Sequence, residues 1–222
     1  MFFYIYSAIA CLQSILSFTV YRNMLNAPTK KLWIFLSVIA TANLLTSTAY
    51  AILFLETVPH HLKMPFFMFC WGVTMLSLQS FIFLLEYITK IPNKLPKIFL
   101  PLNVMLSLYF FYIAFTNNYP AHKDTFFLIV GLYLPSSVMF WTIYGIKRIA
   151  LNSYTSSLKR KITHMLLYGA LPAASLEFLI LLIKHIHVNS FLLIVIYALI
   201  SIELLFWAYT IFLLQSIIKE IS

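Results

Sequence analysis

Seven long apolar segments, separated by short polar links, occupy most of this chain of 222 residues. They cover residues 2–21, 32–55, 64–88, 98–116, 125–146, 163–183 and 190–217. A helix needs about 20 mainly apolar residues to cross the hydrocarbon core of a bilayer, and each segment is close to that length. Because a backbone inside lipid must satisfy its own hydrogen bonds, we predict an all-α bundle of seven membrane-spanning helices.

The composition also favours a membrane protein. Hydrophobic residues make up 62% of the chain and charged residues only 9%, whereas about a quarter of the residues in soluble proteins are charged. The links are short, so we expect residues 1–222 to form a single transmembrane domain in contact with the lipid bilayer. The longest link, residues 147–162, has the pattern of a short amphipathic segment at the membrane surface.

Basic residues are distributed unequally between the two sides that alternating links would reach. One side would receive twelve: Arg22, Lys30, Lys31, Lys90, Lys94, Lys97, Lys147, Arg148, Lys159, Arg160, Lys161 and Lys219. The other would receive three: Lys63, Lys123 and Lys184. Because cytoplasmic loops carry an excess of Lys and Arg, we predict an outer N-terminus and a cytoplasmic C-terminus. The net charge of +9 then reflects topology, and we expect no nucleic-acid partner.

The first apolar segment also has to be compared with a signal peptide. A signal peptide begins with a basic region, but the first basic residue here is Arg22, at the far end of the segment. We therefore expect residues 2–21 to be a retained membrane helix.

Two glutamates fall inside the predicted helices. Glu177 lies seven residues before Lys184, or about 10 Å below the outer end of its helix, and Glu203 lies near the middle of the last helix. Ionisable groups inside a membrane usually face the bundle interior and are functional. Each glutamate is therefore a candidate ligand counter-ion or protonation site, and the alternative is a neutral carboxyl that only hydrogen-bonds neighbouring helices. Straight helices would offset the two in depth by about 9–10 Å, so a shared ligand would need an intermediary such as water.

The second and third helices carry more polar side chains than the others. Asn43 and Gln79 are two further ligand candidates there, beside several Ser and Thr residues. Such side chains can line a ligand cavity or join helices by hydrogen bonds, and we favour the second interpretation. Pro135 and Pro172 lie inside the fifth and sixth helices, where a proline removes a backbone hydrogen bond, so we predict helix kinks at both. Pro172 precedes Glu177 by five residues.

Five of the six histidines fall on the predicted outer side. They are His60, His61, His122, His185 and His187. Converging imidazoles can bind Zn²⁺ or Cu²⁺, and a histidine can also titrate near neutral pH and report external acidity. The alternative is that these residues only occupy the boundary between membrane and water. Whether they form a metal or pH-sensing site depends on whether three outer links meet.

Several kinds of cofactor and catalytic site are not supported by the sequence. A haem held by two histidines within the membrane needs histidines inside helices, and a retinal-type Schiff base needs a lysine in the middle of a helix. The chain has neither, and it has no phosphate-binding glycine loop and no nucleophile elbow. Cys11 and Cys70 both lie in apolar segments and indicate neither a disulfide framework nor a zinc cluster. We expect no cofactor and no enzymatic activity.

Three stretches of the chain are FIFLLEYITKIPNKLPK, SSLKRKITHMLLYGALPAA and FLLQSIIKEIS. They resemble parts of the N-terminal seven-helix sensor region of bacterial histidine kinases and related signalling proteins. FIFLLEYITKIPNKLPK is similar to the family's aromatic helix that ends in a tyrosine, here Tyr87, before a basic link. SSLKRKITHMLLYGALPAA resembles its basic segment leading into a helix with a glycine before a proline, here Gly169 and Pro172. FLLQSIIKEIS resembles its exit into a signalling helix, and the layout is similar across nearly the whole chain.

The resemblance implies a sensor in the bacterial cytoplasmic membrane. It would detect an external or membrane signal and pass it through the seventh helix to a cytoplasmic partner, or act as a homodimer. Residues up to Ser222 include no phosphoacceptor helix and no ATP-binding domain, so kinase activity is not implied. Two alternatives remain open: a small seven-helix transporter, and a non-catalytic structural subunit of a membrane complex. A transporter with internal repeats would show matching prolines in both halves, and no proline inside the first two helices matches Pro135 and Pro172.

Overall fold

The structure confirms an all-α protein. The computed structural model describes residues 2–27, 29–53, 58–89, 94–151, 153–184 and 190–221, and all regular structure within these ranges is helical. The elements are α1 (Phe2–Leu25), α2 (Lys30–Leu53), α3 (His60–Thr89), α4 (Lys94–Thr116), α5 (Tyr119–Leu128), η1 (Ile129–Tyr133), α6 (Leu134–Ala150), α7 (Ser156–Met165), η2 (Leu166–Ala170), α8 (Leu171–Lys184) and α9 (Ser190–Ile221), where η denotes a π-helical turn. Because α5, η1 and α6 are continuous, as are α7, η2 and α8, the described residues form seven long helices.

Six of these long helices have the length and composition needed to cross a membrane. Within the described residues they are Lys30–Tyr50, His61–Thr89, Pro96–Thr116, Tyr119–Ala150, Ser156–Ile180 and Ile194–Ile221. The remaining long helix is α1, with 24 residues. The structure therefore supports an integral membrane protein, while a seventh span through α1 remains a prediction.

The predicted segments agree with the long helices, and most helices extend further at their ends. The largest extension concerns the link that was predicted as a surface segment, because its second half begins α7. There the Thr155 side chain accepts a hydrogen bond from the backbone N–H of Leu158 (3.3 Å) and caps the helix. The helix then continues through η2 into α8. Residues 54 and 55 of the second predicted segment lie outside the described residues.

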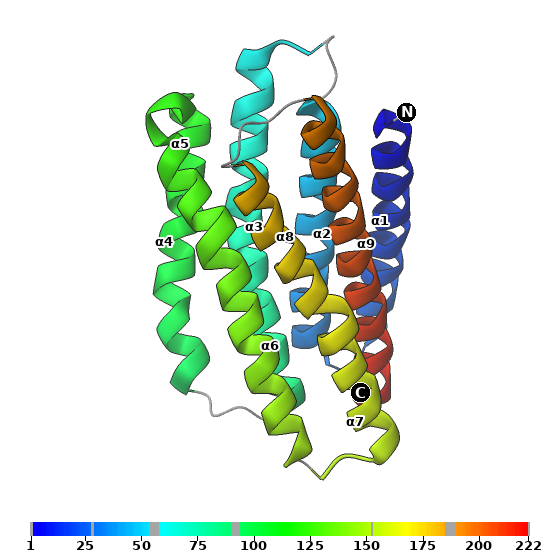
Figure 1. Cartoon of the computed structure of the whole chain (residues 1–222). Helices are drawn as coiled ribbons and strands as arrows, with labels where there is room; N and C mark the ends of the chain where they lie inside the picture. Colours follow the sequence, from blue (N-terminus) through cyan, green and yellow to red (C-terminus); the bar gives the residue numbers. More distant parts are fainter. Residues whose placement is uncertain are drawn as a thin grey trace.

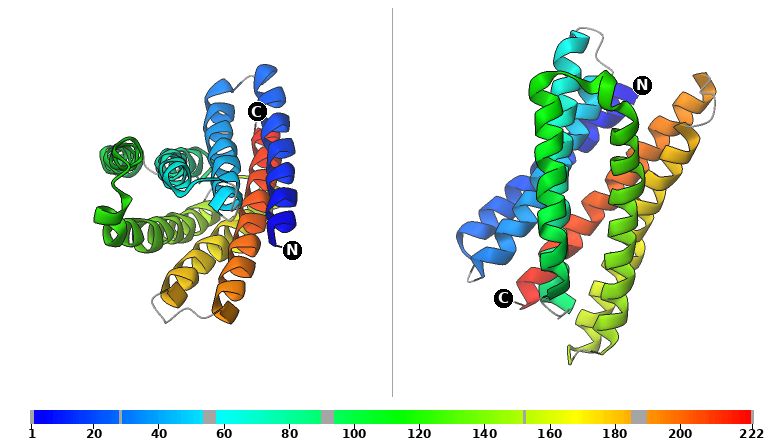
Figure 2. Two further views of the ribbon diagram at one scale, coloured as in Figure 1. Left: turned by 90° about the horizontal axis from the view of Figure 1, so that it is seen from above. Right: turned by 90° about the vertical axis from the view of Figure 1, so that its left-hand side faces the viewer.

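The long helices form one bundle in which α3 and α9 each contact several neighbours. α3 packs against α2 and α4 and also contacts α6, and Figure 2 shows α3 between α2 and α4 when the bundle is seen from above. α9 packs along α8 and contacts α1, α2 and α7. Consequently α2, α3, α6, α8 and α9 surround a common interior.

The ends of the helices alternate as the basic residues predict. Figure 1 shows the starts of α2, α4 and α7 at the lower end of the bundle together with the end of α9. The starts of α3, α5 and α9 lie at the upper end with the N-terminus. The basic first turns of α2 and α4 and the basic helix α7 therefore share one end of the molecule.

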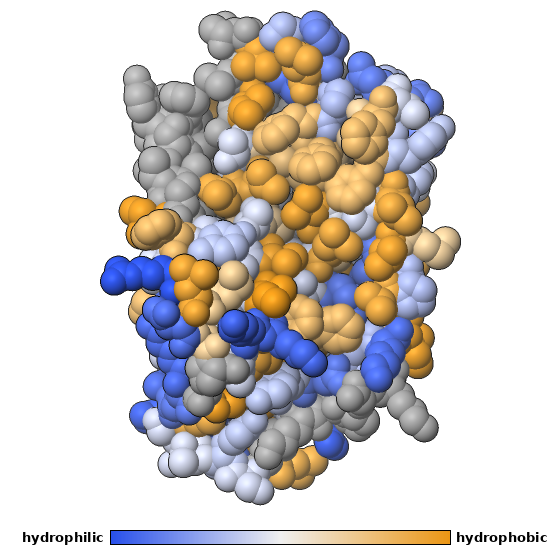
Figure 3. Space-filling view, turned by 180° about the vertical axis from the view of Figure 1, so that it is seen from behind, coloured by the Kyte–Doolittle hydropathy of each residue, from blue (hydrophilic) through white to orange (hydrophobic). Residues whose placement is uncertain are grey.

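The bundle buries large side chains and leaves a broad apolar surface. Trp141, Phe81 and Phe110 are among the largest fully buried side chains. On α4, by contrast, Met105 and Phe115 are 67% and 84% exposed. Figure 3 shows apolar side chains across the middle of one face, with hydrophilic side chains mostly toward its ends. An apolar band of this kind matches the hydrocarbon core of a bilayer.

A π-helical turn precedes each of the two predicted kinks. η1 ends two residues before Pro135, and η2 ends two residues before Pro172. In both, the residue before the proline donates its backbone N–H to the carbonyl five positions earlier. A proline has no N–H to give to the preceding turn, and the wider π-turn keeps the helix continuous there. Such turns occur frequently at functional sites.

Candidate functional site

A cavity of about 60 Å³ lies inside the bundle, measured as the space open to the centre of a water-sized sphere. Five helices contribute its walls: α2, α3, α6, α8 and α9. The lining residues are Ile39, Ala42, Asn43, Thr46, Tyr50, Trp71, Thr74, Ser77, Leu78, Phe81, Leu134, Val138, Glu177, Glu203, Leu204 and Trp207. A water molecule needs roughly 10–15 Å³ by this measure, so the cavity has room for roughly four to six atoms or groups of that size.

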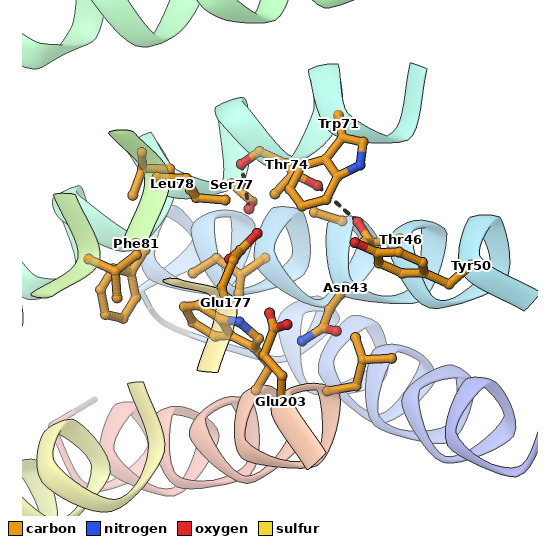
Figure 4. A pocket seen from close by; sticks show the side chains of 16 residues that line it. Asn43, Thr46, Tyr50, Trp71, Thr74, Ser77, Leu78, Phe81, Glu177 and Glu203 are labelled. Carbon is orange, nitrogen blue, oxygen red and sulfur yellow. Dashed lines mark hydrogen bonds between the residues drawn. The ribbon is translucent and has the colours of Figure 1, made fainter. Parts of the chain in front are cut away.

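Three of the four predicted ligand residues meet at this cavity. Glu177 comes from α8, Glu203 from α9 and Asn43 from α2. Each is buried, with 8%, 9% and 9% of its surface exposed, respectively. Figure 4 shows both carboxyl groups and the Asn43 amide directed into the same space. Glu177 and Glu203 therefore line the same cavity, although the sequence predicts that they differ in depth.

Hydroxyl groups form a second part of the cavity wall, between α2 and α3. Thr46 and Thr74 are hydrogen-bonded to each other, with 2.9 Å between their Oγ1 atoms. Ser77 also lines the cavity, and its hydroxyl donates to the Thr74 carbonyl at 2.8 Å. These groups are oriented by their bonds and present further oxygen acceptors to a bound molecule.

Most other hydroxyls of α2 and α3 bond to their own helix rather than across helices. Ser37, Ser47, Thr48 and Ser80 each donate to a backbone carbonyl three or four residues earlier. The predicted bonds between helices are also present, among them Thr46 with Thr74, and Thr41 of α2 with Tyr21 of α1. The polar character of these helices thus serves both the cavity and local helix geometry.

Aromatic side chains form a third part of the cavity wall, beside aliphatic ones, and they were not identified from the sequence. Tyr50 and Trp71 pack edge to face, with ring centroids 6.5 Å apart, and Phe81 and Trp207 do so at 6.0 Å. In Figure 4, Phe81 lies at one end and Tyr50 with Trp71 at the other, with the glutamates between them. Because aromatic residues are common in apolar helices, only their meeting in space identifies them.

Trp71 carries an unsatisfied donor at the cavity. Its indole N–H has no hydrogen-bond partner, and the residue is only 3% exposed. Figure 4 shows its ring extending from α3 toward Thr46 and Tyr50. Buried polar groups are nearly always hydrogen-bonded, and an exception in a cavity wall indicates a site for water or ligand.

Each π-turn leads into a helix that lines the cavity. Leu134 directly follows η1 and Val138 lies one turn later, and both line the cavity. Glu177 lies on α8, the helix that continues from η2. A change in either π-turn would therefore move cavity residues on α6 or α8.

Gln79, the fourth predicted ligand residue, lies elsewhere. Its amide Nε2 donates to the Pro96 carbonyl at 3.2 Å, and its Oε1 accepts from Asn103 Nδ2 at 2.7 Å. The Tyr133 hydroxyl of η1 donates to Asn103 Oδ1 at 2.7 Å. This buried network joins α3, α4 and η1, so Gln79 is hydrogen-bonded between helices and does not line the cavity. Asn103 and Tyr133 were not identified from the sequence, where a single polar residue in an apolar helix gives no indication of its partner.

The histidines do not form a metal site within the described residues. No group of three or more His, Cys, Asp or Glu side chains in those ranges is placed to hold a metal ion. His122 Nδ1 is hydrogen-bonded to the Tyr109 hydroxyl at 2.9 Å, and His61 is exposed near the start of α3. His60 is the first residue of α3, whereas His185 and His187 lie outside the described residues. A site that includes those two histidines remains a prediction.

The cavity thus brings together two carboxyl groups, an amide, several hydroxyl groups and aromatic rings in the interior of the bundle. Comparisons with known protein families, with curated proteins and with solved structures find no match for this chain.

Proposed function

We propose that this protein is a membrane-embedded sensor whose signal is received at the bundle cavity and passed to a cytoplasmic partner by α9. The observation that carries the proposal is the convergence of Glu177 from α8 and Glu203 from α9 on one cavity. A ligand there contacts the last helix directly, so binding biases the position of that helix relative to α8. The resemblance to the sensor region of bacterial histidine kinases favours the same interpretation, and we propose a bacterial cytoplasmic membrane as the location for the same reason.

α9 is suited to carry such a signal because of its length and its contacts. From Glu203 to Ile221 it extends about 27 Å beyond the cavity, at the rise of an α-helix. Near its end Glu220 forms an ion pair with Lys161 of α7. The pair is partly exposed, so its contribution to stability is small. It nevertheless joins the end of α9 to α7, so a movement of α9 would change this contact.

The membrane orientation belongs to this proposal. The end of the bundle that carries α7 and the end of α9 faces the cytoplasm, and the N-terminus faces outward, according to the distribution of Lys and Arg. A reporter that is active only in the cytoplasm, fused after Ser222, should be active in cells. Activity of a periplasmic reporter at that position would contradict the orientation.

A distance measurement tests the proposed signal path. Nitroxide labels are attached to cysteines introduced at two exposed positions, Lys97→Cys on α4 and Lys219→Cys on α9. The native cysteines are first replaced by Cys11→Ser and Cys70→Ala. The distance distribution is compared with and without Glu203→Gln, which replaces the ionisable carboxyl group with a neutral amide of the same shape. Because helix shifts in signalling proteins are about 1–2 Å, we expect a displacement of that order.

Glu86→Gln is the matched control, because Glu86 is a partly exposed glutamate on α3 that does not line the cavity. We expect it to leave the distance unchanged. If Glu203→Gln also leaves the distance unchanged, the sensor proposal is wrong. Uptake of a solute into proteoliposomes that contain the protein would favour the transporter alternative. Purification in a complex of fixed stoichiometry, which cavity variants do not change, would favour a structural subunit.

A further inference from the structure

The charge and shape of the cavity restrict the kind of ligand it accepts. Its lining includes two glutamates and, among the described residues, no Lys, Arg or His. An anion placed there would face two carboxyl groups without a basic residue in the cavity wall. A cation is instead attracted by an ionised carboxylate, and charge-assisted hydrogen bonds to carboxylates are about twice as strong as neutral ones.

The hydroxyl groups favour a cation that carries N–H donors. Thr46 and Thr74 line the cavity beside the carboxyl groups, and each hydroxyl oxygen is a possible acceptor. An ammonium group has three donors and no acceptor, so it matches this set of acceptors. Zn²⁺ and Cu²⁺ are poorer matches, because they prefer nitrogen and sulfur ligands and the cavity lining contains neither His nor Cys.

The aromatic pairs indicate that the cation is organic. The pairs Tyr50–Trp71 and Phe81–Trp207 provide apolar ring faces and edges at the cavity. Trp, Tyr and Phe attract organic cations through the ring quadrupole, as in proteins that bind alkylammonium groups. The same rings accept the hydrocarbon part of an amine.

From these observations we infer that the cavity binds a small protonated amine of roughly four to six non-hydrogen atoms, a size set by the room for water-sized groups. Its ammonium group lies between Glu177 and Glu203, and its hydrocarbon part lies against the aromatic pairs. This inference rests on the proposed sensor function, because it names the ligand class of the same cavity.

The test uses n-butylammonium as the probe. The full chain is reconstituted in nanodiscs of phosphatidylcholine, and binding is measured by calorimetry after subtracting the heat with empty nanodiscs. 1-Butanol and propionate, which have the same number of non-hydrogen atoms, are the neutral and anionic comparators. We expect saturable binding of n-butylammonium and none of the two comparators. Equal binding of 1-butanol, or no binding of n-butylammonium, would overturn the inference.

Variants locate the binding. Glu177→Gln and Glu203→Gln should each weaken n-butylammonium binding by about tenfold or more, the loss expected for one hydrogen bond to a charged group. Glu86→Gln should leave the affinity unchanged. Unchanged affinity in both cavity variants would contradict the site. If a cavity variant does not fold, the comparison of the three probes on the native chain still decides the ligand class.

The two proposals can fail separately. If Glu203→Gln shifts the label distance between positions 97 and 219 but n-butylammonium does not bind, the sensor proposal stands and the amine inference is wrong. If n-butylammonium binds through both glutamates but neither the probe nor Glu203→Gln changes that distance, the amine site is correct and the sensor proposal is wrong.

Discussion

The backbone of Gly169 in the π-turn η2 lies directly against Thr210 of α9. A Cβ atom at position 169 would lie 2.3 Å from Thr210 Oγ1 and 3.4 Å from its Cα. The glycine therefore allows η2 to approach α9 more closely than any other residue would. This contact links the helix that carries Glu177 to the helix that carries Glu203, seven residues before Thr210.

Gly169→Ala should separate η2 from α9. Overpacking a close contact typically costs about 1–3 kcal/mol, so we expect the free energy of unfolding to fall by that amount in an SDS titration in mixed micelles. Thr210→Ala removes the clashing hydroxyl and should recover most of the loss when the two changes are combined. Gly145→Ala is the control, because its Cβ would be 3.3 Å from its nearest neighbour, Leu166. An additive double variant would show that the two residues are not in contact.

The network of Gln79, Asn103 and Tyr133 should contribute to stability rather than to ligand binding. Tyr133→Phe leaves Asn103 Oδ1 without its donor, and Asn103 is fully buried. Leaving a buried acceptor unsatisfied costs about 1–3 kcal/mol, which the same unfolding titration measures. Tyr112→Phe, at an exposed position on α4, should change stability by less than about 0.5 kcal/mol. A Tyr133→Phe protein as stable as the native one would contradict the role given to this network.

The histidine prediction can be decided by metal titration. If His60, His61, His122, His185 and His187 form a site, the purified protein should bind Zn²⁺ in calorimetry, and replacing all five with alanine should abolish the binding. The change His122→Ala also removes the hydrogen bond to Tyr109. The thermal stability of the variant therefore has to be measured together with its Zn²⁺ binding. Absence of Zn²⁺ binding by the native protein would end the metal hypothesis.

The fold was largely predictable because long apolar segments dictate helices. All-α structure and the positions of the long helices follow from hydrophobic length, and Pro135 and Pro172 correctly marked where two helices depart from regular geometry. The form of that departure, a π-turn before each proline, was not predictable. The form of a helix at a proline depends on which backbone N–H groups bond to the free carbonyls, and helix packing determines those bonds.

The candidate site was only partly predictable. Glu177, Glu203 and Asn43 were identified because polar groups in apolar helices are costly and therefore informative. Trp71 and Trp207 were missed because an aromatic residue in an apolar helix is expected almost anywhere. Gln79 lies outside the cavity, and the sequence could not show that Pro96 and Asn103, on another helix, would be its hydrogen-bond partners.

The account depends most on Glu177 and Glu203 sharing one environment, and a double-mutant cycle measures this directly. Glu177→Gln, Glu203→Gln and the double variant are unfolded by SDS in mixed micelles, beside a control cycle of Glu86→Gln with Glu203→Gln. Residues that share an environment deviate from additivity by about 0.5–3 kcal/mol, whereas distant ones add within about 0.3–0.5 kcal/mol. We predict non-additivity of about 1 kcal/mol or more for the cavity pair and additivity for the control pair. Additive effects of Glu177→Gln and Glu203→Gln would contradict the shared cavity and the function built on it.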